Sequence, residues 1–241
     1  MRVLLEPGTE TLSQKAADVV AQLLLTKPDA ALALPTGRTP LGLYSELIRL
    51  HRERNLDFSR AKIFNLDEYI GVPPTDERSF NHYLRRNFLS QVNVNSENVY
   101  LQSAMADNAA CANYEWRIHA AGGIDLLIAG VGTNGHVAFN EPGSAMDSRT
   151  RIIELAGSTR ANMLAVFTPD EMPTHAATIG IATILEARKI LVIATGRTKQ
   201  RALAGLLHGP VTTENPVSAL RLHDDIIVIA DREAAPDDPA S

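Results

Sequence analysis

The chain has 241 residues, of which 45% are hydrophobic and 21% charged, a composition typical of globular proteins that excludes disorder of the whole chain. Its 28 acidic residues outnumber its 23 basic ones, which argues against nucleic acid or a membrane as a partner. The single cysteine, Cys111, cannot form an intrachain disulfide, and no apolar run reaches the roughly 18 residues of a membrane span. We therefore expect a cytoplasmic protein with one domain.

Short apolar segments alternate with longer amphipathic ones. Apolar residues spaced three and four apart indicate helices, and short runs rich in Val, Ile, Leu and Ala indicate buried strands. The predicted order is strand 3–5, helix 11–26, strand 30–34, helix 40–52, strand 61–65, helices 80–89 and 108–121, strands 125–130 and 190–195, helix 198–207, and strand 225–230. This alternation predicts an α/β fold: a doubly wound, mostly parallel sheet with helices on both faces.

Two parts of the chain lack a strong pattern. In the segment 144–180, which follows a helix-stopping Pro142-Gly143 pair, the weak pattern predicts a lid over the functional site. Residues 232–241, rich in Ala, Pro and Asp, predict a flexible tail. The predicted domain therefore spans residues 1–231.

In open α/β sheets, ligands bind beyond the carboxyl ends of the strands, so polar residues directly after a strand are the candidates. Residues 34–40 (LPTGRTP) end a predicted strand and open a helix, and the helix N-terminus with Thr36, Gly37, Arg38 and Thr39 favours an anion. The second such turn, 195–199 (TGRTK), adds the cation of Lys199. A bound phosphate and plain capped turns both remain open here.

Two further turns carry groups for proton transfer. Asp67, in the run 65–69 (NLDEY), follows a strand, and screening by Phe64 and Tyr69 would suit a general base, although adjacent acids are more often a solvated turn. Residues 130–143 (GVGTNGHVAFNEPG) match a dinucleotide-binding glycine pattern, but the Pro-Gly pair stops the long helix that this motif requires. The loop instead displays Asn134, His136 and Glu141, a plausible acid–base group.

No metal or cofactor is expected. The seven histidines are never three to five residues apart, as helical zinc pairs would be.

Taken together, these motifs resemble the glucosamine-6-phosphate deaminase family, also called glucosamine-6-phosphate isomerase, over nearly the whole chain. The matching segments are 34–40, 64–69 (FNLDEY), 130–136 (GVGTNGH), 139–142 (FNEP), 148–150 (SRT), 177–185 (ATIGIATIL) and the Gly196-x-x-Lys199 turn.

The resemblance implies conversion of glucosamine 6-phosphate and water to fructose 6-phosphate and ammonia, in amino-sugar catabolism. It assigns ring opening to His136, tuned by Glu141 and Asn134, and the C2-to-C1 proton transfer to Asp67. It assigns phosphate binding to a set drawn from both turns and the lid: Thr36, Gly37, Arg38, Thr39, Arg160 and Lys199.

Some family members have Asp at position 134, and regulated members have Arg-Ile-Lys where this chain has Arg151, Ile152 and Ile153. The missing lysine predicts weak or no activation by N-acetylglucosamine 6-phosphate. The sequence decides neither between a monomer and a homo-oligomer nor between the gluco and galacto epimers of the substrate. The alternatives are a 6-phosphogluconolactonase-like hydrolase and a non-catalytic sugar-phosphate sensor domain; Asp67 beside the His136–Glu141 pair favours the deaminase.

Overall fold

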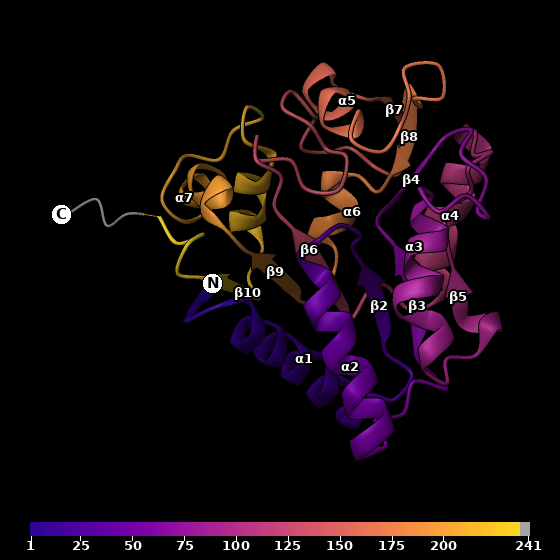
Figure 1. Cartoon of the computed structure of the whole chain (residues 1–241), viewed down its shortest axis with the longest axis vertical. Helices are drawn as coiled ribbons and strands as arrows, with labels where there is room; N and C mark the ends of the chain where they lie inside the picture. The colour runs from indigo at the N-terminus through magenta and orange to yellow at the C-terminus, as the bar shows by residue number, and fades with distance from the viewer. Residues whose placement is uncertain (237–241) are drawn as a thin grey trace.

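The computed structural model describes residues 1–236, apart from the side chains of Ser158 and Asn162. Its centre is a seven-stranded sheet in the order β1-β10-β9-β6-β2-β3-β5 (Figure 1), and every neighbouring pair runs parallel. The strands are β1 (Arg2–Glu6), β2 (Ala31–Leu34), β3 (Lys62–Asn65), β5 (Val99–Tyr100), β6 (Leu126–Gly130), β9 (Ile190–Ala194) and β10 (Ile226–Asp231). The predicted doubly wound, mostly parallel α/β fold is confirmed.

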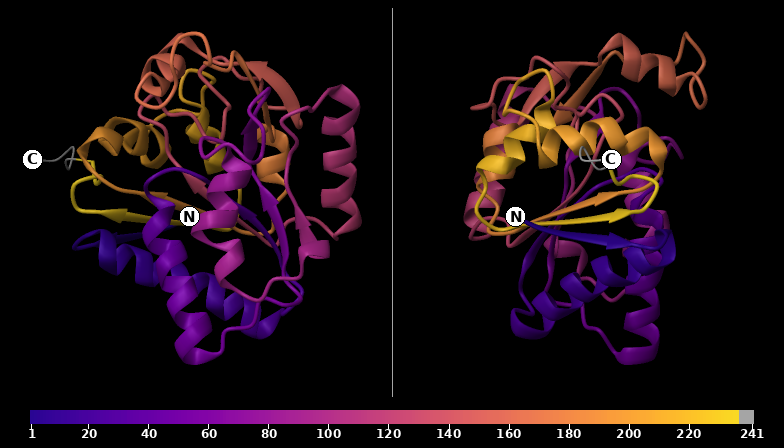
Figure 2. Two further views of the ribbon diagram at one scale, coloured as in Figure 1. Left: turned by 45° about the vertical axis from the view of Figure 1, so that its right-hand side comes forward. Right: turned by 90° about the vertical axis from the view of Figure 1, so that its left-hand side faces the viewer.

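Helices cover both faces of this sheet, as the two views of Figure 2 show. On one face lie α1 (Thr9–Thr26), α2 (Pro40–Arg54) and α3 (Phe80–Asn87). On the other lie α4 (Asn108–Ala120), α6 (Ile181–Leu185), α7 (Gln200–Leu207) and the 3-10 helix Pro216–Leu222. The strands between them are apolar on both sides, so that every residue of β2 and β9 is buried.

The helices follow the predicted apolar spacing. In α1, for example, Leu12, Ala16, Val20 and Leu24 recur every four residues and are buried against the sheet. All five predicted helices are present, with boundaries shifted by a few residues.

A second, three-stranded antiparallel sheet was not predicted. It has the order β4-β8-β7 and lies beside the carboxyl ends of the parallel strands (Figure 1). Its strands are β4 (Asp67–Tyr69), β8 (His175–Thr178) and β7 (Arg151–Glu154), and α5 (Gly157–Met163) connects β7 with β8 through a loop. The segment 144–180, predicted to be a lid, therefore contains β7, α5 and β8. Its residues Leu155, Met163 and Phe167 belong to an apolar cluster separate from the two beside the parallel sheet.

The chain remains packed beyond the domain end predicted at residue 231. The Ala234 side chain is fully buried, and its N–H donates to the Asp231 carboxylate at 2.8 Å. At the start of the predicted flexible tail, residues 232–235 form a turn against the end of β10. Its last five residues, 237–241, lie outside the described part. No helix in the described part is both long and apolar enough to cross a membrane.

Candidate active site

The candidate site lies where the order of the parallel sheet reverses. From β2 the chain continues to β3 and β5 on one side, whereas β6, the other neighbour of β2, leads to β9 and β10 on the opposite side. The loops that leave β2 and β6 must therefore diverge, and such a switch point is the usual ligand site of an open α/β sheet. A cavity of about 390 Å³ occupies it. Seven of the ten predicted site residues line this cavity: Thr36, Gly37, Arg38, Thr39, Asp67, His136 and Lys199.

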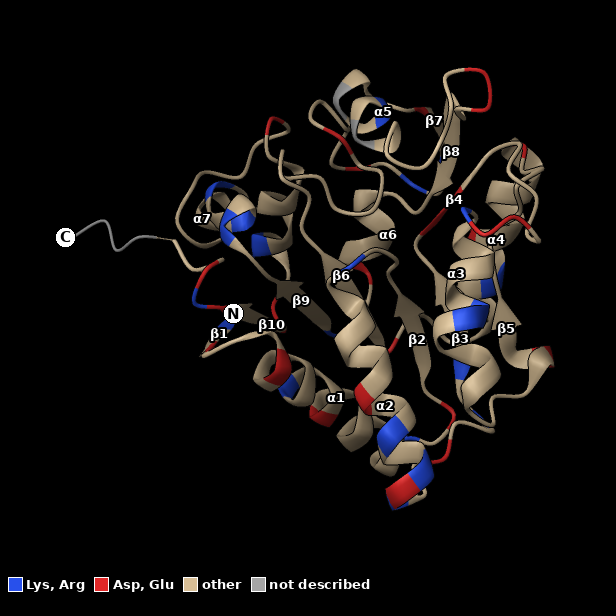
Figure 3. Ribbon diagram, in the orientation of Figure 1, with Lys and Arg blue, Asp and Glu red and all other residues tan. Residues whose placement is uncertain are grey.

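The two turns predicted to bind phosphate form one wall. Gly37 has a φ of +106°, a conformation that favours glycine, and its carbonyl accepts a 2.5 Å hydrogen bond from the Tyr83 hydroxyl. The second turn begins at Gly196, also at positive φ, whose N–H donates to the Asp231 carboxylate at 3.0 Å. From this turn Lys199 reaches the cavity, where partial burial lowers the pKa of its ammonium group. Basic residues thus gather at the start of α7 (Figure 3).

Asp67 contributes a buried carboxylate to the opposite wall. Its side chain is 7% exposed, and no described residue donates a hydrogen bond to its carboxylate. Burial, with the adjacent charge of Glu68 adding to it, raises the pKa of Asp67 to about 8. A carboxylate in this state accepts a proton more readily than a solvated one, as a general base near neutral pH requires.

Aromatic rings beside Asp67 explain its poor solvation. Tyr69, Phe80 and Phe139 line the same cavity, with ring centroids 4.5 Å apart for Tyr69–Phe80 and 5.5 Å for Tyr69–Phe139. The predicted screening by Tyr69 is therefore present. Phe64, which was also predicted to screen Asp67, instead stacks on Tyr100 in the core of the parallel sheet.

Glu68, the next residue, has a structural role that the sequence did not reveal. It is fully buried and accepts hydrogen bonds from the Tyr69, Phe80 and Asn81 N–H groups at 2.8–3.0 Å, the Ser79 hydroxyl at 2.7 Å and the Asn81 amide at 2.6 Å. Three of these donors open α3, where the helix dipole also favours a negative charge. Glu68 therefore holds β4 against α3 and fixes the backbone that presents Asp67.

The glycine loop after β6 carries the predicted acid–base group. His136 lines the cavity, and its Nδ1 lies 3.5 Å from Oε2 of Glu141, which also accepts a 2.7 Å hydrogen bond from the Asn134 amide. Burial alone would raise the pKa of Glu141, but the neighbouring His136 imidazole and Thr159 hydroxyl outweigh it and hold that pKa below its ordinary value. Glu141 is therefore an anion at neutral pH, suited to stabilising an imidazolium.

Glycine is required beneath the His136 ring. A Cβ at Gly132 would lie 2.4 Å from the imidazole atoms, and the Gly132 N–H donates to the His136 carbonyl at 2.9 Å. The loop thus closes on itself and sets the ring orientation. Asn134 and Glu141 do not line the cavity; they lie behind His136 and position it.

Arg160 is the predicted phosphate residue that the structure does not bring to the cavity wall. It lies on α5, and its buried Nε has no hydrogen-bond partner among the described residues. The neighbouring Thr159, which the sequence analysis missed, donates from its hydroxyl to Oε1 of Glu141. The helix that carries Arg160 is thereby tied to the His136 loop.

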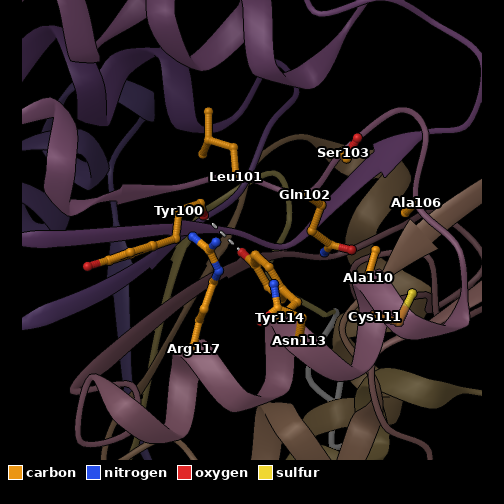
Figure 4. Close-up of a pocket in the computed structure, with 10 residues that line it drawn as sticks. All are labelled: Tyr100, Leu101, Gln102, Ser103, Ala106, Ala110, Cys111, Asn113, Tyr114 and Arg117. Atoms are coloured by element: carbon orange, nitrogen blue, oxygen red, sulfur yellow. Dashed lines mark hydrogen bonds between the residues drawn. The ribbon is translucent and has the colours of Figure 1, made fainter.

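A smaller cavity of about 200 Å³ lies between β5 and α4 (Figure 4). The Tyr114 hydroxyl points across it toward β5 and donates to the carbonyls of Asn65 and Tyr100 at 2.8 and 3.2 Å. Its lining holds none of the predicted site residues, so we place the site in the larger cavity. Within the described residues, no three His, Cys, Asp or Glu side chains are grouped as a metal site.

The fold and this cavity define an α/β protein with a polar site at the switch point of its sheet. A model of the family described as glucosamine-6-phosphate isomerases/6-phosphogluconolactonase matches residues 7–228. The chain belongs to this family.

Relatives and solved structures resemble the chain over nearly its full length. The glucosamine-6-phosphate deaminase of Halothermothrix orenii is 42% identical over 238 residues, which cover 98% of this chain and 99% of that protein. That of Clostridium botulinum (strain Hall) is 40% identical over 98% of each. A solved structure described as a monomeric glucosamine-6-phosphate deaminase has a TM-score of 0.94 and 40% identity, covering 97% of this chain and 98% of that one. The 6-phosphogluconolactonase of Trypanosoma cruzi, at TM-score 0.78 and 22% identity over 97% of this chain and 95% of that one, shows the shared fold alone.

Proposed function

We propose that the protein converts glucosamine 6-phosphate and water to fructose 6-phosphate and ammonia. The observation that carries this proposal is the buried carboxylate of Asp67, without a hydrogen-bond donor among the described residues, in one cavity with His136 and Lys199. An aldose-to-ketose conversion needs a base at a carbon, an acid at the ring oxygen and a distant anchor for the phosphate. The names of full-length relatives at 40–42% identity support the same reaction.

Ring opening is the first step that we assign. The anomeric O–H loses its proton while the ring oxygen gains one, breaking the bond from C1 to that oxygen and giving an open-chain aldehyde. His136 is the group placed to shuttle this proton, because its imidazole lines the cavity and Glu141 stands 3.5 Å behind it. Glu141 stabilises the protonated ring, and the Asn134 amide holds Glu141 in place.

Asp67 performs the carbon chemistry. The carboxylate removes the C2 proton, the C1 oxygen gains a proton, and a C1=C2 enolamine results. Return of the proton from Asp67 to C1 then gives a protonated imine at C2. Water adds to this carbon, a proton moves from the added oxygen to the nitrogen, and ammonia leaves. Loss of the remaining hydroxyl proton, which replaces the one given to the C1 oxygen, leaves the C2 ketone of fructose 6-phosphate. The raised pKa of Asp67, about 8, makes its carboxylate a stronger base than a solvated one.

Thr36, Gly37, Arg38, Thr39 and Lys199 form the phosphate anchor in this proposal. Holding the phosphate at a distance fixes C1 and C2 against Asp67, and such orientation supplies several kcal/mol of rate acceleration. We also propose that the segment 144–180 closes over the bound sugar as a lid and brings the Arg160 guanidinium to the phosphate. Its Nε, buried with no partner among the described residues, supports this role.

The rate should depend hyperbolically on substrate concentration and should not respond to N-acetylglucosamine 6-phosphate. Ile153, at the position where regulated members have lysine, packs its apolar side chain against the cluster beneath the small sheet. The lack of a nucleotide or metal requirement, and a cytoplasmic location, are parts of the same proposal.

A direct comparison of two substrates tests the proposal against the lactonase alternative. Purified protein is given glucosamine 6-phosphate or 6-phosphogluconolactone without added metal or nucleotide, and ammonia, fructose 6-phosphate and lactone loss are measured. We expect equal amounts of ammonia and fructose 6-phosphate, and lactone loss at the uncatalysed rate. Catalysed lactone hydrolysis without ammonia release would replace the deaminase with a lactonase, which needs no base at carbon. Binding of the amino sugar without turnover would instead indicate a sensor domain.

A further inference from the structure

A loop that the proposed mechanism does not use lies behind the His136 loop. The segment 212–217 comprises the end of the connection that follows α7 and the first two residues of the 3-10 helix, and it bonds to the His136 loop at two points. The Val217 N–H donates to the Gly135 carbonyl at 2.8 Å, and the Gly143 N–H donates to the Thr213 carbonyl at 2.9 Å. The backbone that presents His136 is therefore held from outside at both ends.

Asn215 occupies the centre of this arrangement. A Cβ at Gly135 would lie 1.8 Å from its Oδ1, and a Cβ at Gly205 would lie 1.9 Å from its Nδ2. The side-chain amide thus lies between the His136 loop and α7, and a side chain on either glycine would have to displace it. Gly135 additionally needs its positive φ of +86°, whereas Gly205 has no such requirement.

Gly205 lowers the stability of the helix that contains it. It lies inside the eight-residue helix α7, where glycine is about 1 kcal/mol less favourable than alanine. An alanine Cβ at this position would displace the Asn215 amide from its place against α7. Because α7 starts directly after Lys199, the Asn215 amide links the acid–base loop to the helix that carries a phosphate-binding cation.

Neighbouring residues cannot take the place of the Asn215 amide, because a cavity lies beside it. This cavity of about 470 Å³ is lined by Asn134, Gly205 and Asn215 among others. Removing the amide would therefore enlarge an existing void rather than allow neighbours to close around it. A void here borders Asn134, which holds Glu141 behind His136.

We infer that Asn215 is a positioning residue, whose amide sets the His136 loop against the helix of Lys199 through its contacts with Gly135 and Gly205. The inference rests on the proposed function, because it concerns the placement of His136 and Lys199 for that reaction. A shift of about 1 Å in such a placement lowers turnover by up to about 100-fold.

The first test compares Asn215→Ala with Ser218→Ala. Ser218 anchors the same segment through hydrogen bonds with the Thr212 backbone at 2.9 and 3.2 Å, and within the described residues it forms no hydrogen bond with Gly135. We expect Asn215→Ala to lower kcat by about ten-fold or more, with KM changed less than about three-fold. Ser218→Ala should lower Tm while leaving kcat within about two-fold. An equal loss of kcat in both variants would show that Asn215, like Ser218, only stabilises the loop in general, and it would overturn the inference.

The second test is a double-mutant cycle with Gly205→Ala. The added Cβ should displace the Asn215 amide and lower kcat as Asn215→Ala does, although alanine favours the helix. Since both changes break the same contact, the double variant should be no slower than either single one. Losses that multiply, or a Gly205→Ala protein with wild-type kcat, would contradict the inference.

Hydrogen exchange separates this inference from the proposed function. Amides of residues 131–141 should exchange faster in Asn215→Ala and in Gly205→Ala than in wild type or Ser218→Ala, whatever the substrate is. Unchanged exchange would overturn the inference. Absence of turnover by the wild type with the exchange difference present would reject only the proposed reaction.

Discussion

The hydroxyl oxygens of Thr39 and Thr195 lie 3.0 Å apart, although 156 residues separate them in the chain. Thr39 ends the turn after β2, and Thr195 follows β9, so this hydrogen bond joins the two predicted anion-binding turns. Adjacent strands of a parallel sheet would bring such turns together, but β6 lies between β2 and β9. The hydrogen bond therefore bridges across one strand and joins the two turns into a single wall, which we propose binds the phosphate.

Breaking this bridge should weaken substrate binding rather than chemistry. We expect Thr195→Val to raise KM by about three- to ten-fold with little change in kcat, because a neutral hydrogen bond contributes about 0.5–1.5 kcal/mol. Thr195→Ser keeps the hydroxyl and serves as the matched control, with near wild-type KM. Steady-state kinetics with glucosamine 6-phosphate measures both constants. A selective fall in kcat would contradict an anchoring role.

Lys199 should act as the main cation of the anchor. Its ammonium group is half-buried and makes no ion pair with a described residue, which leaves it free for an anionic ligand. We expect Lys199→Met to raise KM by about 10- to 100-fold, since a hydrogen bond to a charged group contributes about 1.5–3 kcal/mol. Arg201→Met, two residues later on α7, is the control and should change KM little. Equal effects of the two variants would indicate general electrostatic attraction instead of a specific contact.

The titration of Asp67 gives a pH prediction with a defined direction. Because burial raises the pKa of Asp67 to about 8, the free enzyme should gain active base as the pH rises toward that value. The kcat/KM should therefore increase between about pH 6 and 8 and then level off. Carboxyl carbon NMR of the substrate-free protein, with the Asp67 signal assigned by its absence in Asp67→Asn, separates this titration from that of the substrate. A midpoint near 4 for this carboxyl would contradict the account.

Asp67 should also reduce stability as the pH rises. A raised pKa in the folded protein means that the folded state binds the Asp67 proton more tightly than the unfolded state does. The stability that this proton binding contributes is fully present below about pH 4 and is lost by about pH 8. Asp67→Asn removes this loss, and its gain in Tm over wild type should grow from near zero at pH 4 to a few degrees at pH 8. Glu68→Gln is the contrasting control, because it removes the anion that five donors surround and should lower Tm. Thermal unfolding at several pH values measures the Tm of both variants. A Tm difference between Asp67→Asn and wild type that does not change with pH would contradict the raised pKa of Asp67.

Much of the parallel sheet could be predicted, because a strand that is buried on both faces has a continuous run of apolar residues in the sequence. Strands such as β9, with five buried aliphatic residues, have few alternatives. The small sheet could not be predicted in this way. Its strands have three or four residues, and β4 is separated from β3 by Leu66 alone, so that its pattern merges with the preceding strand.

The candidate site divides along similar lines. Asp67, His136 and Lys199 could be predicted because each follows a strand, and the carboxyl ends of parallel strands meet at one edge. The separate roles of Asp67 and Glu68 depend on which carboxylate the donors of α3 surround, and two adjacent acids give no sign of this. Asn215 was also missed, although a glycine inside a helix, Gly205, is a signal of close approach that the sequence does contain.

Turnover of glucosamine 6-phosphate by wild type and by Asp67→Asn, with no metal or nucleotide added, tests directly whether Asp67 is the base of a deaminase. Ammonia and fructose 6-phosphate are quantified together, and binding of the phosphosugar is measured separately by calorimetry. We expect equal amounts of the two products from wild type, a fall in kcat of about 10²- to 10⁴-fold in the variant, and nearly unchanged binding. Wild-type turnover that survives in Asp67→Asn, or parallel losses of binding and turnover, would contradict the role of Asp67 as the base.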